Sequence, residues 1–239
     1  MFQIEVLLSP ALLPYHQVQN KHVIVVDILR ATSTIVTAIN EGASHVKTVL
    51  NAEEAAELKG EGYLSAGERN GAKMEGFDMG NSPFECMEGK VLNQKLALTT
   101  TNGTKCFNAA KEAGAQTILA GSFLNLDATV DWLINHPADC IVLCAGWKNK
   151  VNLEDTLYAG LLTQRLIDSN VATTEDDGAL MAMDILQMAG SDFADFLKKS
   201  SHYQRLSHLH HHEDMVYCLK QSTIEVVVGM KDNMLVKFL

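Results

Sequence analysis

The sequence lacks the features that mark several common classes of protein. Its 239 residues include only four prolines and no uninterrupted apolar run long enough to span a bilayer. Its net charge of −10 excludes a general nucleic-acid surface, because phosphate backbones require a basic patch. The opening residues MFQIEV provide no basic segment followed by an apolar core, so we expect a cytoplasmic protein without a secretory signal.

Several reactive motifs are also missing. The chain contains no H-E-x-x-H, no G-x-S-x-G, no paired-cysteine zinc signature and no Walker A loop. Its five cysteines are odd in number and scattered, which favours reduced, mostly buried thiols over a disulfide framework. Residues 210–212 are consecutive histidines, whose side chains diverge by about 100° each around a helix. We therefore expect a solvated helix end there.

Strand-like and helical stretches alternate through the first two thirds of the chain. This alternation predicts a largely parallel sheet with helical crossovers. We expect strands near 2–8, 22–27, 45–50, 62–66, 95–99, 116–120 and 139–144, and helices at 31–41, 52–59, 103–113 and 123–135. After residue 154 the pattern becomes helical, with helices near 154–169, 175–189, 191–199, 201–208 and 212–219. Two strands, 223–228 and 233–238, close the chain as a hairpin. We expect one compact α/β unit over 1–239, with a sheet-rich half at 1–150 and a helical half at 151–239.

The segment HVIVVDILRATST, residues 22–34, predicts an anion site. A buried strand ends at Asp27, and the next helix begins with three hydroxyl residues, Thr32, Ser33 and Thr34. Ligands of open α/β sheets bind at this edge, and helix N-termini attract anions. Arg30 adds a planar fork of donors suited to phosphate, sulfonate or carboxylate. The alternative is that Asp27 or Ser33 only caps the helix and Arg30 pairs on the surface.

The longest segment without periodicity is GERNGAKMEGFDMGNSP, residues 67–83. Such long irregular segments are uncommon in compact domains and are often functional. It carries charged and amide side chains, so we expect it to form part of the site; the alternative is a solvated flap. The candidates are Glu68, Arg69, Asn70, Asp78, Asn81 and Ser82.

Three further strand ends resemble the first. Residues 96–105, LALTTTNGTK, lead from a strand into hydroxyls and a glycine, so that Thr99 to Asn102 can cradle an anion. The segments ending at Ser122 and Gly146 also finish in small or polar residues. Four such strand ends predict a single crevice along one edge of the sheet.

Adjacent carboxylates at a helix start, Glu154 and Asp155, have two interpretations. They favour the helix macrodipole, which needs no ligand. A hard cation also binds such oxygens, with water completing its shell. Together with Asp27, Glu68 and Asp78, they are candidate Mg²⁺ ligands.

The chain resembles the 2-phosphosulfolactate phosphatase family. The similar strings are VVDILRATSTIVTA, GERNGxKxxGFDxGNSP, LTTTNGT and LEDxxxAG, in the family's order and over nearly the whole chain. The resemblance implies a three-layer α/β/α fold, a homodimer, and a Mg²⁺-dependent hydrolase of a phosphate monoester of sulfolactate, first known from coenzyme M synthesis. Such a substrate is a small phosphorylated sulfonate.

The resemblance also assigns roles to residues. Catalytic roles fall on Asp27, Arg30, Ser33, Glu68, Asn70 and Asn102. Metal binding falls on Asp27, Glu68, Asp78, Glu154 and Asp155. Substrate binding falls on Arg30, Thr32, Ser33, Asn81, Ser82, Thr100, Thr101, Asn102 and Gly103, to which the polar segment and the strand ends described above add Arg69 and Ser122.

The expected reaction is hydrolysis by direct attack of water on phosphorus. The haloacid-dehalogenase-type phosphatases carry a second aspartate two residues after the first, and Leu29 occupies that place here. A covalent aspartyl-phosphate is therefore less favoured. One alternative is a phosphatase for another small phosphorylated 2-hydroxy acid; another is a non-catalytic protein that binds a phosphorylated or sulfonated metabolite.

Overall fold

The computed structural model describes residues 1–69, 71–209 and 211–239. Its strands form one mixed sheet in the order β5-β4-β6-β3-β11-β10-β7-β2-β8-β1-β9. Their bounds are β1 (Phe2–Leu7), β2 (His22–Val26), β3 (His45–Thr48), β4 (Tyr63–Arg69), β5 (Ala72–Lys73), β6 (Lys95–Thr99), β7 (Thr117–Gly121), β8 (Cys140–Cys144), β9 (Ala172–Thr173), β10 (Val228–Lys231) and β11 (Met234–Lys237).

The sheet consists of two parallel groups joined by the C-terminal hairpin. In one group β2 lies between β7 and β8, and β1 follows β8. In the other, β6 lies between β3 and β4. The hairpin joins them through one antiparallel residue pair on each side, Gly229 with Leu119 and Leu235 with Val46. A mixed, mostly parallel sheet was predicted and is confirmed.

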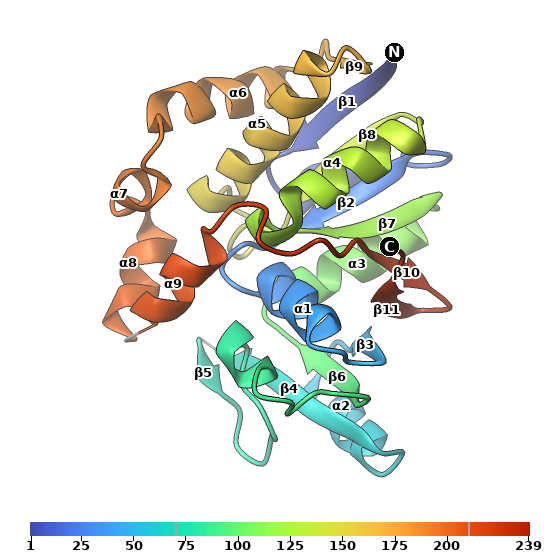
Figure 1. Cartoon of the computed structure of the whole chain (residues 1–239), viewed down its shortest axis with the longest axis vertical. Helices are drawn as coiled ribbons and strands as arrows, with labels where there is room; N and C mark the ends of the chain where they lie inside the picture. Colours follow the sequence, from blue (N-terminus) through green and yellow to red (C-terminus); the bar gives the residue numbers. More distant parts are fainter. Residues whose placement is uncertain (70, 210) are drawn as a thin grey trace.

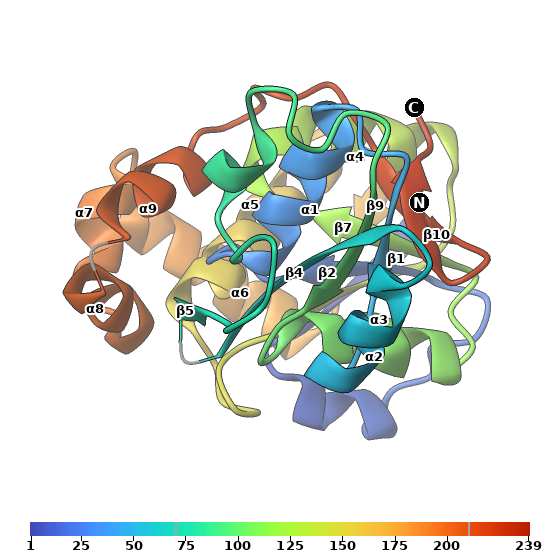
Figure 2. The same ribbon diagram turned by 90° about the horizontal axis from the view of Figure 1, so that it is seen from below.

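Helices follow most strands. Their bounds are α1 (Ala31–Asn40), α2 (Ala52–Lys59), α3 (Gly103–Glu112), α4 (Leu126–Asn135), α5 (Leu153–Asp168), α6 (Asp177–Ala189), α7 (Phe193–Leu197), α8 (Ser201–His208) and α9 (His212–Cys218). Short 3-10 helices are η1 (Pro10–Tyr15), η2 (Pro83–Cys86) and η3 (Phe123–Asn125). Both views show α7, α8 and α9 grouped at one end of the molecule (Figure 1 and Figure 2).

The layers follow from the alternation of side chains along the buried strands. Ile24 and Val26 of β2 pack with apolar residues of α4 and α5, whereas Val23 and Val25 pack with those of α1 and α3. Ala97 of β6 faces a third cluster, formed with α2. The arrangement is a three-layer α/β/α fold, as expected from the resemblance. The five cysteines are all buried and unpaired, also as expected.

Several boundaries differ from the sequence prediction, and two of them affect the site and the hairpin. Strand β4 continues to Arg69 and pairs with β5, so Glu68 lies on a strand and not in an irregular loop. The first strand of the hairpin spans Val228–Lys231, and the predicted strand residues 223–227 lie outside it. The backbone of Val227 bonds instead to Phe238 and Leu239, after the end of β11. The turn is set by Asp232 and Asn233, whose φ angles are 50° and 65°. Within the described ranges, no helix has the length and apolar character needed to cross a membrane.

Candidate functional site

One pocket lies where strand ends from both parallel groups meet the C-terminal helices. Residues from the ends of β2, β4, β6 and β8 line one side of it, and residues of α8 line the other. The lining residues are Asp27, Leu29, Arg30, Glu68, Gly71, Asn81, Thr100, Asn102, Trp147, His202, Arg205 and Leu206. The predicted crevice at strand ends is therefore present, but its second wall comes from a helix far along the chain.

Asp27 lies in the wall formed by β2 and is almost fully buried. Its Oδ1 accepts a hydrogen bond of 3.3 Å from the backbone N–H of Ala31, at the start of α1. Gly103 allows α3 to approach closely, because a Cβ atom there would lie 2.7 Å from Asp27 Oδ2. Burial raises the pKa of Asp27 to about 6; nearby Glu68 and Glu154 add to the rise, and His202 opposes it. A carboxylate with this pKa exchanges protons near neutral pH.

Glu68 connects two loops of the pocket through its carboxylate. Its Oε1 accepts hydrogen bonds from the backbone N–H and the hydroxyl of Thr101, at 2.9 and 2.8 Å. Its Oε2 accepts one from the N–H of Gly71, at 2.6 Å. These donors fix the Glu68 side chain against the pocket wall, and the residue is only 7% exposed. Of the two loop carboxylates predicted for the site, Glu68 is the one that reaches the pocket.

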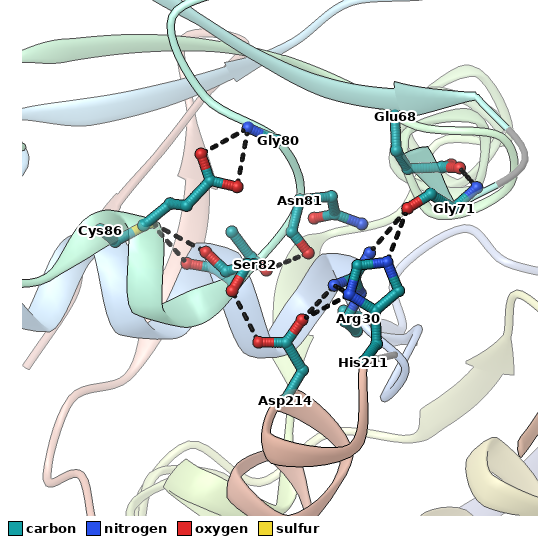
Figure 3. Close-up of polar contacts among 11 residues, drawn as sticks. Arg30, Glu68, Gly71, Gly80, Asn81, Ser82, Cys86, His211 and Asp214 are labelled. Atoms are coloured by element: carbon teal, nitrogen blue, oxygen red, sulfur yellow. Dashed lines mark hydrogen bonds and ion pairs between the residues drawn. The ribbon is translucent and has the colours of Figure 1, made fainter. Parts of the chain in front are cut away.

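Arg30 is held by a network that spans the chain (Figure 3). Its Nη1 contacts the carboxylate of Asp214 and lies 3.0 Å from His211 Nδ1, and its Nη2 donates to the carbonyl of Gly71 at 3.3 Å. Asp214 also accepts a bond of 2.6 Å from the hydroxyl of Ser82. The Arg30 side chain is 3% exposed, so its ion pair is buried and not on the surface.

His211 differs from the solvated helix end that was predicted. Its Nε2 lies 2.9 Å from the carbonyl oxygen of Gly71, and its Nδ1 faces Arg30. The ring therefore donates from Nε2 and accepts at Nδ1, which fixes its tautomer. No local pattern predicts these contacts, because Arg30 and Gly71 lie far from His211 in the chain. His212 is exposed, and His210 lies outside the described residues.

The two carboxylates at the start of α5 have different environments. Asp155 accepts hydrogen bonds from the N–H groups of Ile28 at 2.9 Å and Gly146 at 3.0 Å, which ties the loops after β2 and β8 together. Burial, with Asp27 and Glu154 nearby, raises the pKa of Asp155. Glu154 is fully buried and its Oε1 is hydrogen-bonded to Nδ1 of His202.

Several hydroxyls predicted to bind substrate are occupied within the protein. Ser33 donates to the carbonyl of Ile28 at 2.9 Å and lies 3.0 Å from the hydroxyl of Ser122, and both serines are fully buried. Thr32 bonds to the backbone of Asp27 as donor and acceptor. These contacts shape the turn after β2, and none of the three hydroxyl residues lines the pocket.

Of the remaining candidates, some line the pocket and others are turned away from it. Thr100, Asn102 and Asn81 line the pocket, and the Oδ1 of Asn81 is buried without a partner among the described residues. Arg69 is turned toward the carbonyl of Glu68 and the hydroxyl of Thr99, outside the lining. The predicted catalytic residue Asn70 lies outside the described residues.

The five carboxylates predicted as metal ligands do not form one cluster. Asp78 accepts bonds from the N–H and hydroxyl of Ser65 and pairs with Lys59 at 2.9 Å. Burial opposes the shift, but Lys59 and Ser65 lower the pKa of Asp78 to about 2. Asp78 thus anchors its loop to β4. In residues 1–69, 71–209 and 211–239, no three His, Cys, Asp or Glu side chains are grouped to hold a metal ion.

Sequence reasoning missed the residues that α8 and the loop after β8 contribute. Trp147 stacks on His202 with ring centroids 5.7 Å apart, and the Arg205 guanidinium carbon lies 3.8 Å from the centroid of the same indole ring. The only signal in the sequence was Trp147, which follows the predicted strand 139–144 after Ala145 and Gly146. Helix 201–208 was predicted correctly, but its position over the sheet edge depends on tertiary packing.

One family model and several named proteins are similar to this chain. The family model described as 2-phosphosulpholactate phosphatase matches residues 7–233. Proteins named "Probable 2-phosphosulfolactate phosphatase" are similar along most of their length. The protein of Thermotoga maritima is 37% identical over 93% of this chain and 95% of its own, and that of Clostridium beijerinckii is 32% identical over 97% and 98%. That of Gloeothece citriformis is 34% identical over 90% and 91%.

Proposed function

Because the chain belongs to the 2-phosphosulfolactate phosphatase family, and is thus a phosphoric monoester hydrolase, we propose that it hydrolyses 2-phosphosulfolactate to sulfolactate and phosphate with the help of Mg²⁺. The observation that carries the proposal is the pocket itself. It combines the guanidinium groups of Arg30 and Arg205 with the carboxylates of Asp27 and Glu68. Its lining also includes the residues that precede α1 and α3. Helix N-termini and guanidinium groups favour a multiply charged anion.

The oxygen atoms of the pocket fit a Mg²⁺ ion. Mg²⁺ is commonly bound by one or two carboxylates, with substrate phosphate and water completing the octahedron. Asp27 and Glu68 supply the carboxylates, and the unpartnered Oδ1 of Asn81 is a further oxygen donor in the same lining. A bound cation would polarise phosphoryl oxygens and offset the cost of burying Asp27 as an anion.

The chain's own residues supply binding and proton transfer. Arg30, rigidly held by Asp214, presents a fixed positive charge to the phosphoryl group. His202 lines the pocket and its Nδ1 is occupied by Glu154, so Nε2 is the ring nitrogen left for exchange with substrate or water. When both ring nitrogens carry a proton, the one at Nε2 can pass to the leaving oxygen. In the metal-free pocket the pKa of Asp27 is about 6, and where Asp27 does not coordinate the cation its carboxylate can accept a proton from the attacking water.

The direct test is phosphate release from a panel of monoesters with and without Mg²⁺. We expect turnover of 2-phosphosulfolactate that chelator abolishes and Mg²⁺ restores. Full activity in excess chelator would contradict the metal requirement without affecting the assignment of substrate. Faster turnover of phospholactate would instead favour another phosphorylated 2-hydroxy acid. Binding of 2-phosphosulfolactate without phosphate release would favour a metabolite-binding protein.

A further inference from the structure

The pocket contains a second arginine whose environment differs from that of Arg30. The fork of Arg30 is already engaged by Asp214 and the carbonyl of Gly71. Arg205 is stacked on Trp147 and has no carboxylate partner within the described residues. Its Nη1 atom is buried and has no hydrogen-bond acceptor among them. A buried charged donor left unpaired is costly, which indicates that an anionic ligand completes it.

Arg205 is also placed at the mouth of the pocket and not at its base. It lines the pocket together with Asp27 and Glu68, and it lines an outer depression on the surface together with Trp147 and Gln204. Asp27, in contrast, is 8% exposed and lies against the start of α1. A substrate whose phosphate reaches Asp27 therefore places its other end beside Arg205.

We propose that Arg205 binds the anionic group of the substrate that is not transferred, a sulfonate or carboxylate, and so selects substrates that carry a second charge. The inference rests on the proposed function, since it assumes that the phosphate occupies the inner part of the pocket. Trp147 supports the role because the indole face holds the guanidinium plane in one orientation. The arginine then presents its fork to two oxygens of one anion.

A binding experiment tests the role without turnover. Sulfolactate, which carries a carboxylate and a sulfonate but no phosphate, is titrated calorimetrically into the natural chain and into Arg205→Gln. We expect the variant to bind about tenfold more weakly or worse, as for loss of a charged hydrogen-bond pair. Arg165→Gln is the matched control, because Arg165 pairs with Asp127 on the surface and should leave affinity unchanged.

A second measurement reports on the site directly. Trp132 and Trp147 are the two tryptophans of the chain, so Trp132→Phe leaves Trp147 as the single indole fluorophore. Sulfolactate should change the fluorescence emission of Trp147 in the Trp132→Phe variant. It should have little effect on this emission in the double variant that also carries Arg205→Gln. Equal affinity of the natural chain and Arg205→Gln, or no binding of sulfolactate to the natural chain, would overturn the proposal.

Kinetics separate this inference from the proposed function. For 2-phosphosulfolactate, Arg205→Gln should raise KM at least tenfold and change kcat less than threefold. KM for ethyl phosphate, which lacks a second anion, should stay within twofold. An equal loss for both substrates would contradict a role in selecting the second anion. If the natural chain binds sulfolactate through Arg205 yet hydrolyses no monoester, the proposed function fails, and Arg205 is left as a residue that binds a sulfonate or carboxylate without a role in turnover.

Discussion

The carboxylate of Glu154 is hydrogen-bonded to Nδ1 of His202, although 48 positions separate the two residues. Glu154 lies in the first turn of α5 and His202 in the first turn of α8, so the pair fixes α8 over the end of the sheet. Glu154 is fully buried and its Oε2 has no partner in the described part of the chain. A fixed carboxylate behind an imidazole orients the ring and sets its tautomer.

We expect His202→Asn to lower kcat by about 10²-fold or more, because proton transfer by a positioned side chain contributes on this scale. Glu154→Gln should lower kcat less, since the ring remains but loses its orienting charge. Steady-state kinetics with 2-phosphosulfolactate measure both effects. Ser207→Ala, at an exposed position on the same helix that lines neither the pocket nor the outer depression, is the control and should retain full activity. An active His202→Asn enzyme would assign the proton transfer to another group.

Asp27→Asn should abolish activity and yet stabilise the metal-free protein. The pKa of Asp27 is about 6 in the folded chain and 3.8 ordinarily. Between these two pH values the folded state therefore binds more protons than the unfolded state. The free energy of unfolding consequently falls as the pH rises through this range. Two pKa units correspond to about 3 kcal/mol. In chelator at pH 7.5 the variant should therefore unfold at higher denaturant concentration, and this difference should vanish below about pH 4. A variant no more stable than the natural chain would show that the burial cost is offset elsewhere.

Of the residues that could bind Mg²⁺, we expect Asn81 to contribute to the affinity for the ion and Asp78 not to contribute. Asn81→Ala should raise the Mg²⁺ concentration needed for half-maximal activity and weaken calorimetric Mg²⁺ binding, because it removes an unpartnered oxygen from the lining. Asp78→Asn is the matched control. It should leave the Mg²⁺ requirement unchanged, since Asp78 anchors its loop through Ser65 and Lys59. The reverse pattern would restore Asp78 as a ligand and exclude Asn81.

The buried pair of Arg30 and Asp214 should be important for both stability and activity. Asp214→Asn leaves the Arg30 charge unpaired in the interior, and we expect it to lower the free energy of unfolding by about 3–5 kcal/mol. Arg30→Lys keeps a charge but cannot contact Asp214 and Gly71 together, so kcat/KM should fall strongly. Asp127→Asn, which breaks an exposed pair with Arg165, should cost less than about 1 kcal/mol. Kinetics of Arg30→Lys that match the natural chain would make Arg30 purely structural.

Local patterns predicted most elements because each depends on neighbouring residues. The unbroken apolar run at Val23–Val26 predicted β2, and the hydroxyls after Asp27 predicted the start of α1. The exceptions have physical reasons. Residues 223–227 carry strand-like side chains, but their backbone bonds to segments outside the strands, Ile224 to Leu124 and Val227 to Phe238 and Leu239. The chain after residue 67 continues β4 because β5 pairs with it.

The sequence alone determined that Asp27, Thr100 and Trp147 follow strand ends, since that placement requires only a buried strand and the small or polar residues after it. Tertiary structure decided what faces them. Asp214 meets Arg30 across 184 positions, and α8 brings His202 and Arg205 over the sheet edge. It also decided that Ser33 and Ser122 lie in contact with each other and outside the lining of the pocket. No local pattern encodes such contacts, because they arise only when the helices after α5 pack against the strand ends that the first half of the chain provides.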